Sequence, residues 1–81
     1  MNEFMMFAQA TEGDFTVGQE KLNQVAQVLA YNWVYMRIPP DTLSVKQVCN
    51  RLGFHYDQLL SEEIDYLERK TEEEISKYGA T

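Results

Sequence analysis

The sequence predicts an all-α fold: a small helical domain with a long first helix, a helix-turn-helix-like pair and a long acidic C-terminal helix. Two long stretches repeat apolar residues at steps of three and four, which is the helical period. Consecutive prolines, Pro39 and Pro40, end the first stretch, and Gly53 separates a short helical pattern from the last stretch. These signals divide the chain into three main helices.

The first long helix is expected over residues 17–37. Thr16 followed by Gln19 has the spacing of a capping box, in which two side chains satisfy amides at the start of a helix. Pro39 and Pro40 end the helix, because proline donates no backbone hydrogen bond and restricts the residue before it. The apolar stripe of this helix comprises Leu22, Val25, Ala26, Leu29, Trp33 and Met36.

A helix-turn-helix outline occupies residues 44–60. Ser44, with Gln47 three positions later, is expected to cap a short helix. Gly53 is expected to end it, because glycine adopts left-handed backbone angles without a Cβ clash. The apolar face of the short helix comprises Val45, Val48, Cys49 and Leu52.

The spacing around this glycine resembles the helix-turn-helix units of bacterial regulators, including the AraC-like kind. A small residue, Cys49, lies four positions before the glycine, Phe54 follows it directly, and Leu59 lies six positions after it. Glu62 departs from the pattern, which has an apolar residue nine positions after the glycine. The resemblance covers about a fifth of the chain. It implies a helix-turn-helix shape and, as the associated function, DNA binding.

The last helix is expected over residues 56–78, which is about 34 Å at the usual rise per residue. Asp65 with Arg69, and Glu73 with Lys77, are acid-before-base pairs four positions apart. A small domain does not easily cover so long a helix, so its distal half is expected to pair with another chain, as in a homodimer. Its apolar face comprises Leu60, Ile64, Leu67, Thr71, Ile75 and Tyr78.

The chain of 81 residues is expected to form one domain, with a helical unit over residues 16–81 and an N-terminal arm or short helix over residues 1–15. The single cysteine excludes an intrachain disulfide and indicates a reducing, cytoplasmic location. No stretch has the length of a membrane span. The predicted core comprises Leu22, Val25, Leu29, Trp33, Val45, Val48, Cys49, Leu52, Phe54, Leu60, Ile64 and Leu67.

Charge argues against nucleic-acid binding. The net charge is −6, and the segment 57–77 carries eight acidic and three basic side chains. Acids on a reading helix repel phosphate, from which most DNA affinity derives. If DNA is bound, the candidate contacts are Lys46, Arg51, His55, Tyr56 and Gln58.

The acidic last helix has two interpretations. A solvated helix face is one. The other is a surface for a partner protein with a basic surface. The candidate partner contacts are Glu62, Glu63, Asp65, Glu72 and Glu73.

No catalytic constellation is present, because the chain has one histidine, His55, and one cysteine, Cys49, separated by a glycine turn. We therefore expect no enzyme activity, cofactor or metal site. The leading hypothesis is a small regulatory protein that binds another protein, such as a transcription modulator or a phage-type inhibitor. The alternatives are a dimeric helix-turn-helix DNA-binding regulator and a structural or assembly protein.

Overall fold

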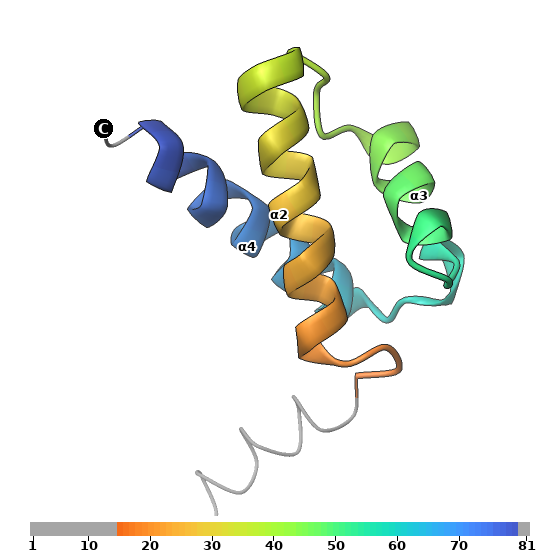
Figure 1. The fold of residues 1–81 in the computed structure, drawn as a ribbon. Helices are drawn as coiled ribbons and strands as arrows, with labels where there is room; N and C mark the ends of the chain where they lie inside the picture. The colour runs from red at the N-terminus through yellow and green to blue at the C-terminus, as the bar shows by residue number, and fades with distance from the viewer. Residues whose placement is uncertain (1–14, 80–81) are drawn as a thin grey trace, which may run out of the picture.

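The computed structural model describes residues 15–79, which form three α-helices and one 3-10 turn (Figure 1). These are α2 (Gln19–Met36), α3 (Thr42–Arg51), η1 (Tyr56–Gln58) and α4 (Ser61–Gly79). Within this part of the chain there is no strand. The all-α prediction, with long first and last helices, is therefore confirmed. The predicted arm over residues 1–15 lies outside the described residues, apart from Phe15.

Helix α2 is the central element, because α3 and α4 each make their main helix–helix packing with it. In Figure 1, α4 crosses behind α2, and α3 lies on the right. Contacts at both ends show that α2 and α4 run in the same general direction. Near their starts, the Tyr66 hydroxyl donates to Asn23 Oδ1 at 2.6 Å. Near their ends, the rings of Tyr35 and Tyr78 meet edge to face at 5.6 Å between centroids.

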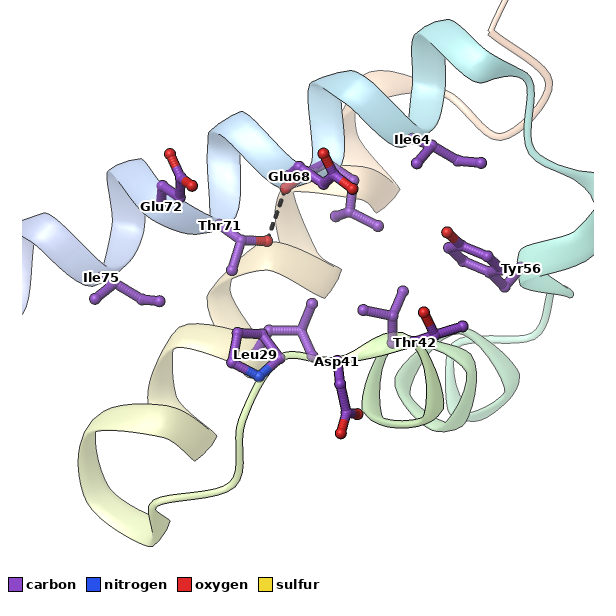
Figure 2. A pocket seen from close by; sticks show the side chains of 12 residues that line it. Leu29, Asp41, Thr42, Tyr56, Ile64, Glu68, Thr71, Glu72 and Ile75 are labelled. Carbon is purple, nitrogen blue, oxygen red and sulfur yellow. Dashed lines mark hydrogen bonds between the residues drawn. The ribbon is translucent and has the colours of Figure 1, made fainter.

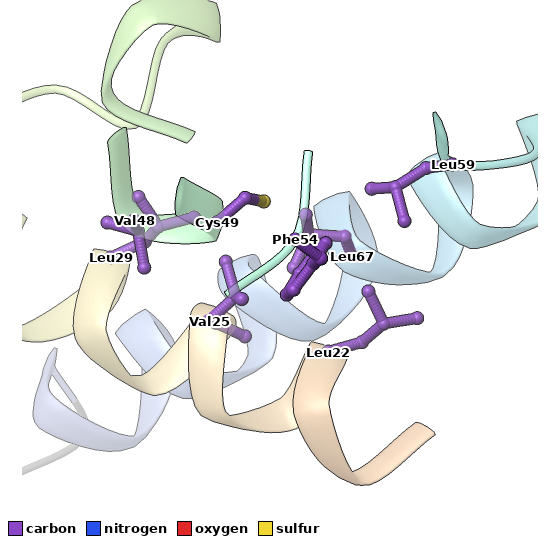
Figure 3. Close-up of a cluster of buried hydrophobic side chains, with 9 residues drawn as sticks. Leu22, Val25, Leu29, Val48, Cys49, Phe54, Leu59 and Leu67 are labelled. Atoms are coloured by element: carbon purple, nitrogen blue, oxygen red, sulfur yellow. The ribbon is translucent and has the colours of Figure 1, made fainter. Parts of the chain in front are cut away.

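The hydrophobic core lies where the three helices and the turn after α3 meet around Phe54 (Figure 3). Most of the predicted core is confirmed, but Leu60 is 40% exposed and Leu59 is buried in its place. Trp33 is only half-buried. The core comprises Leu22, Val25, Ala26, Leu29, Val48, Cys49, Phe54, Leu59 and Leu67, with Val45, Leu52 and Ile64 packed against it.

Both predicted N-caps on the first two helices are wrong. Gly18 precedes α2 and provides no side-chain cap, while Thr16 turns to a distant carboxylate instead. Asp41 caps α3, and its Oδ1 accepts from the backbone N–H of Ser44 at 2.9 Å. Since Asp41 is as good a cap as Ser44 and directly follows the proline pair, α3 begins one turn earlier than predicted.

The last helix is divided rather than continuous from residue 56. After η1 the backbone is extended at Leu59 (φ −74°, ψ 143°), and α4 begins at Ser61. The extended residue changes which leucine faces inwards, which explains the exchange of Leu60 for Leu59. The start of α4 is fixed by Glu63 Oε1, which accepts from the Leu60 N–H at 2.8 Å. This is one half of a capping box.

Glu63 is the most unusual core residue, because its side chain is charged and 0% exposed. Its carboxylate also accepts from the Val17 N–H at 2.9 Å and from the Thr16 hydroxyl at 2.8 and 3.1 Å. Burial alone raises the pKa of Glu63, but these hydrogen bonds outweigh it and lower the pKa below its ordinary value. One buried anion thus joins the segment before α2 to the start of α4.

Helix α2 ends in a left-handed residue, Arg37 (φ 58°), where glycine is usual. The N–H groups of Arg37 and Ile38 donate to Trp33 O and Asn32 O at 3.2 and 3.1 Å, and the first of these is the 5→1 bond of an αL C-cap. The guanidinium of Arg37 lies 5.5 Å from the centre of the Trp33 ring. A cation–π contact therefore accompanies a backbone conformation that side chains rarely adopt.

Glu63→Gln should lower the free energy of unfolding by about 1–3 kcal/mol, because the amide that replaces this buried carboxylate cannot accept from all three of its donors. The depressed pKa gives a pH dependence: the contribution of Glu63 is complete above the ordinary value of 4.5 and is lost as pH falls through the lower folded value. Urea denaturation of the unmodified protein and of Glu63→Gln, from neutral to acidic pH, measures the difference in their free energies of unfolding. Exposed Glu62→Gln is the control, with an expected change below about 0.5 kcal/mol. A difference that stays constant through acidic pH would contradict this account.

Arg37→Gly should be more stable than Arg37→Ala by about 1 kcal/mol, because only glycine adopts the left-handed conformation without strain. Both substitutions remove the contact with Trp33, so the comparison isolates the backbone. At Met36, the last residue of α2, the order should reverse, because alanine is favoured over glycine within a helix. Thermal unfolding of the four variants tests this, and the same order at both positions would refute it.

Candidate interaction surfaces

The helix-turn-helix outline is only partly formed. Its first helix and glycine turn are present, with Gly53 at φ 97° and the Phe54 N–H donating to Cys49 O at 3.1 Å. The chain then forms the short turn η1 and an extended residue, Leu59, before α4 begins. The residues predicted to read DNA after the glycine therefore lie on a turn of three residues and not along a helix.

The five nucleic-acid candidates do not form a basic face. Lys46 Nζ lies 3.8 Å from Asp57 Oδ1, so the positive charge of Lys46 has an acidic neighbour. Gln58 Oε1 accepts from the backbone N–H of His55 at 3.4 Å. Tyr56 is half-buried and lines a groove between helices. Arg51 is the last residue of α3 and is exposed.

Four of the five predicted partner contacts are exposed on α4, namely Glu62, Asp65, Glu72 and Glu73. Glu63 is not available to a partner, because it is buried and hydrogen-bonded within the chain. No sequence signal indicated this difference, since Glu62 and Glu63 are adjacent acids and only the fold separates their environments.

The predicted intrahelical ion pairs are replaced by others. Arg69 Nε donates to the backbone oxygen of Asp65 at 3.4 Å, and Lys77 Nζ lies 3.0 Å from Glu74 and not beside Glu73. Lys70 Nζ lies 3.1 Å from Glu73 and 3.7 Å from Glu74. The hydrogen bond from Lys77 is the main cause of a lowered pKa at Glu74. Both lysines of α4 are thus engaged by acids along one edge of the helix.

One face of the distal half of α4 is buried within the chain. Leu67, Thr71 and Glu74 are 2%, 5% and 8% exposed. The Thr71 hydroxyl donates to Leu67 O at 2.7 Å, so its polar group is satisfied in the interior. Tyr78 near the end of this half is 37% exposed, and the expected pairing with a second chain stays a prediction.

A groove of about 250 Å³ lies between the start of α3, η1 and α4 (Figure 2). In Figure 2, α4 forms one side, and Thr42 and Tyr56 lie on the other. Its floor and walls are mainly apolar, formed by Leu29, Pro40, Val45, Tyr56, Ile64, Leu67 and Ile75 with the methyl-bearing Thr42 and Thr71.

Every charged side chain that lines this groove is acidic: Asp41, Glu68 and Glu72. Glu68 and Glu72 are four residues apart on α4, and Asp41 is the N-cap of α3. Sequence reasoning missed Asp41 and Glu68 and assigned Tyr56 to DNA. The i,i+4 spacing of the two glutamates was the available signal, but the position of α3 was not readable from the sequence.

Cys49 is the best-defined titratable group away from these surfaces. It is 0% exposed, and burial raises the pKa of its thiol to about 11. It therefore behaves as a small apolar side chain at neutral pH. Among residues 15–79, no cluster of three or more His, Cys, Asp or Glu side chains could hold a metal ion.

Comparisons with protein-family models, curated proteins and solved structures give no match to this chain. Within the described residues, no helix has both the length and the apolar character of a membrane span.

Cys49 should react with iodoacetamide at least about a hundredfold more slowly in the folded protein than in guanidinium at pH 8, because the thiolate is the nucleophile and burial suppresses it. Mass spectrometry of timed samples gives both rates. Equal rates would show that the thiol is accessible and would contradict the buried assignment.

Proposed function

We propose that this chain is a small non-enzymatic regulatory protein that acts by binding another protein. The supporting observation is the exposed surface of α4, where Glu62, Asp65, Glu72 and Glu73 face outwards. Lys70 lies beside Glu73 and Lys77 beside Glu74, and Arg69 is also exposed on this helix, so the four acids leave the surface with a net negative charge. Such a surface attracts a partner that carries basic side chains and disfavours partners with phosphate backbones.

DNA binding is the second candidate, because the glycine turn after α3 is formed and Lys46 and Arg51 lie on that helix. The charge distribution weighs against it. Phosphate contacts require several bases on one face, whereas Lys46 lies beside Asp57 and the first turn of α4 carries Glu62. A structural or assembly role is the third candidate, and oligomers that grow with concentration in sedimentation would favour it.

We expect that this protein does not bind random duplex DNA even at low salt. We also expect that a partner protein binds to the acidic surface of α4. Fluorescence anisotropy of labelled duplex over a salt series measures the first. Crosslinking in a lysate of the source cells, followed by recovery of tagged protein, measures the second. Replacing Glu62, Asp65, Glu72 and Glu73 together by Lys should reduce recovery of the partner at least about tenfold, because attraction becomes repulsion.

Glu20→Lys, a charge reversal on the exposed start of α2, is the control and should leave recovery unchanged. Circular dichroism verifies that both variants keep their helices. Steeply salt-dependent DNA binding by the unmodified chain would overturn the proposal in favour of the DNA-binding alternative. Equal recovery with the fourfold variant would also overturn it.

A further inference from the structure

We propose that the groove between α3 and α4 is a docking site for a basic amphipathic helix of a partner protein. The apolar side chains of that helix would enter the groove, and its flanking Lys or Arg side chains would meet the acidic rim. This inference rests on the proposed function and extends it by naming the site and the chemistry of the partner.

The groove lies between α3 and α4, each of which packs mainly on α2. Leu29 of α2 and Leu67 of α4 form its floor and are 1% and 2% exposed. Val45 from α3 and Ile64 from α4 form walls that are only half-buried. The walls therefore retain apolar surface that an inserted side chain would remove from water, at about 25 cal/mol per Å².

The size of the groove favours the side chains of a partner helix, rather than a small-molecule ligand, as its occupant. Its volume is about 250 Å³, below the roughly 300–1,000 Å³ of pockets that enclose drug-sized molecules. The Thr71 hydroxyl is the polar group in the floor, and it already donates to Leu67 O. The floor therefore holds no unsatisfied polar side chain, since the described residues have no buried side-chain nitrogen or oxygen without a hydrogen-bond partner.

The acidic residues that line the groove indicate which kind of macromolecule would bind there. Glu68 and Glu72 lie on the α4 side of the groove, whereas the carboxylate of Asp41 on the α3 side caps that helix and points away from α4 (Figure 2). No Lys, Arg or His lines the groove among the described residues. A helix with apolar side chains at i, i+3, i+4 and i+7 and bases beside them would place opposite charge against the α4 rim. Helix-in-groove recognition commonly uses this arrangement of apolar anchors.

The same charges disfavour two other occupants. Residues 1–14 of this chain are apolar in part, but their charged side chains are Glu3, Glu12 and Asp14, all acidic. A second copy of the chain carries a net charge of −6. Either occupant would bring like charge to an acidic rim.

The experiment uses the full chain and a synthetic fluorescein-labelled Leu/Lys peptide with a single apolar helical stripe. We expect saturable binding by anisotropy, with methyl NMR shifts at Val45, Ile64 and Ile75 and none at exposed Leu43. Replacing Glu68 and Glu72 together by Lys should lower the affinity for the peptide at least about tenfold, because two attractive contacts become repulsive. A scrambled peptide of the same composition, which lacks the stripe, should bind at least about tenfold more weakly.

Glu20→Lys, combined with Gln24→Lys and Gln27→Lys, is the matched control. It makes the same total change in charge at exposed positions of α2, outside the groove and outside the four exposed acids of α4, and should alter peptide affinity less than about twofold. Equal weakening by the groove variant and by this control would mean nonspecific attraction and would overturn the proposal. Binding of a Leu/Glu peptide with equal affinity, or absence of methyl shifts in the groove, would overturn it too.

The alternative occupants are also outcomes of this experiment. Displacement of the Leu/Lys peptide by a synthetic peptide of residues 1–14 would assign the groove to the chain itself and overturn the proposal. A sedimenting dimer that dissociates on the Glu68 and Glu72 reversal would assign it to a second copy, with the same consequence. If the peptide does not bind in the groove while partner recovery still depends on the four exposed acids of α4, the proposed function stands and only the assignment of the site is wrong.

Discussion

The buried carboxylate of Glu63 is the interaction on which the arrangement of the helices depends. Its oxygens accept from the backbone N–H groups of Leu60 and Val17 and from the Thr16 hydroxyl. The first bond sets where α4 begins, and the others hold the segment before α2 against that point. Because the anion also lies at the positive end of the α4 dipole, its charge is stabilised without a basic partner. Together with the contact between Tyr35 and Tyr78, this junction keeps α2 and α4 running in the same general direction.

That junction also explains why the chain has a groove. With α2 and α4 joined at their starts and in contact near their ends through Tyr35 and Tyr78, α3 has only the remaining side of α2 on which to pack. It is anchored at its C-terminal end by Val48 and Cys49, while its N-terminal end carries Val45 beside the open groove. The core is therefore closed at one end of α3 and open at the other.

The spacing of apolar residues and glycine in the sequence predicted the features of the fold that depend on a single segment. The apolar steps from Leu22 to Leu29 indicated the buried face of α2, and Gly53 indicated the turn after α3, because both depend on spacing along one segment. The burial of Glu63 was not predictable in this way, because two of its donors, Thr16 and Val17, lie more than forty residues away in sequence. The groove was missed for the same reason, since it needs the relative placement of three elements.

The distribution of charge on α4 separates a merely solvated face from one suited to a partner. On a solvated helix, acids and bases intermix and largely cancel. Here Lys70 and Lys77 both lie near Glu74 on one edge, whereas Glu68 and Glu72 border an apolar groove whose described lining contains no base. Acids held beside half-buried apolar surface resist burial on their own. Together they favour an occupant that supplies apolar side chains and positive charge at once, which is the chemistry of a basic amphipathic helix.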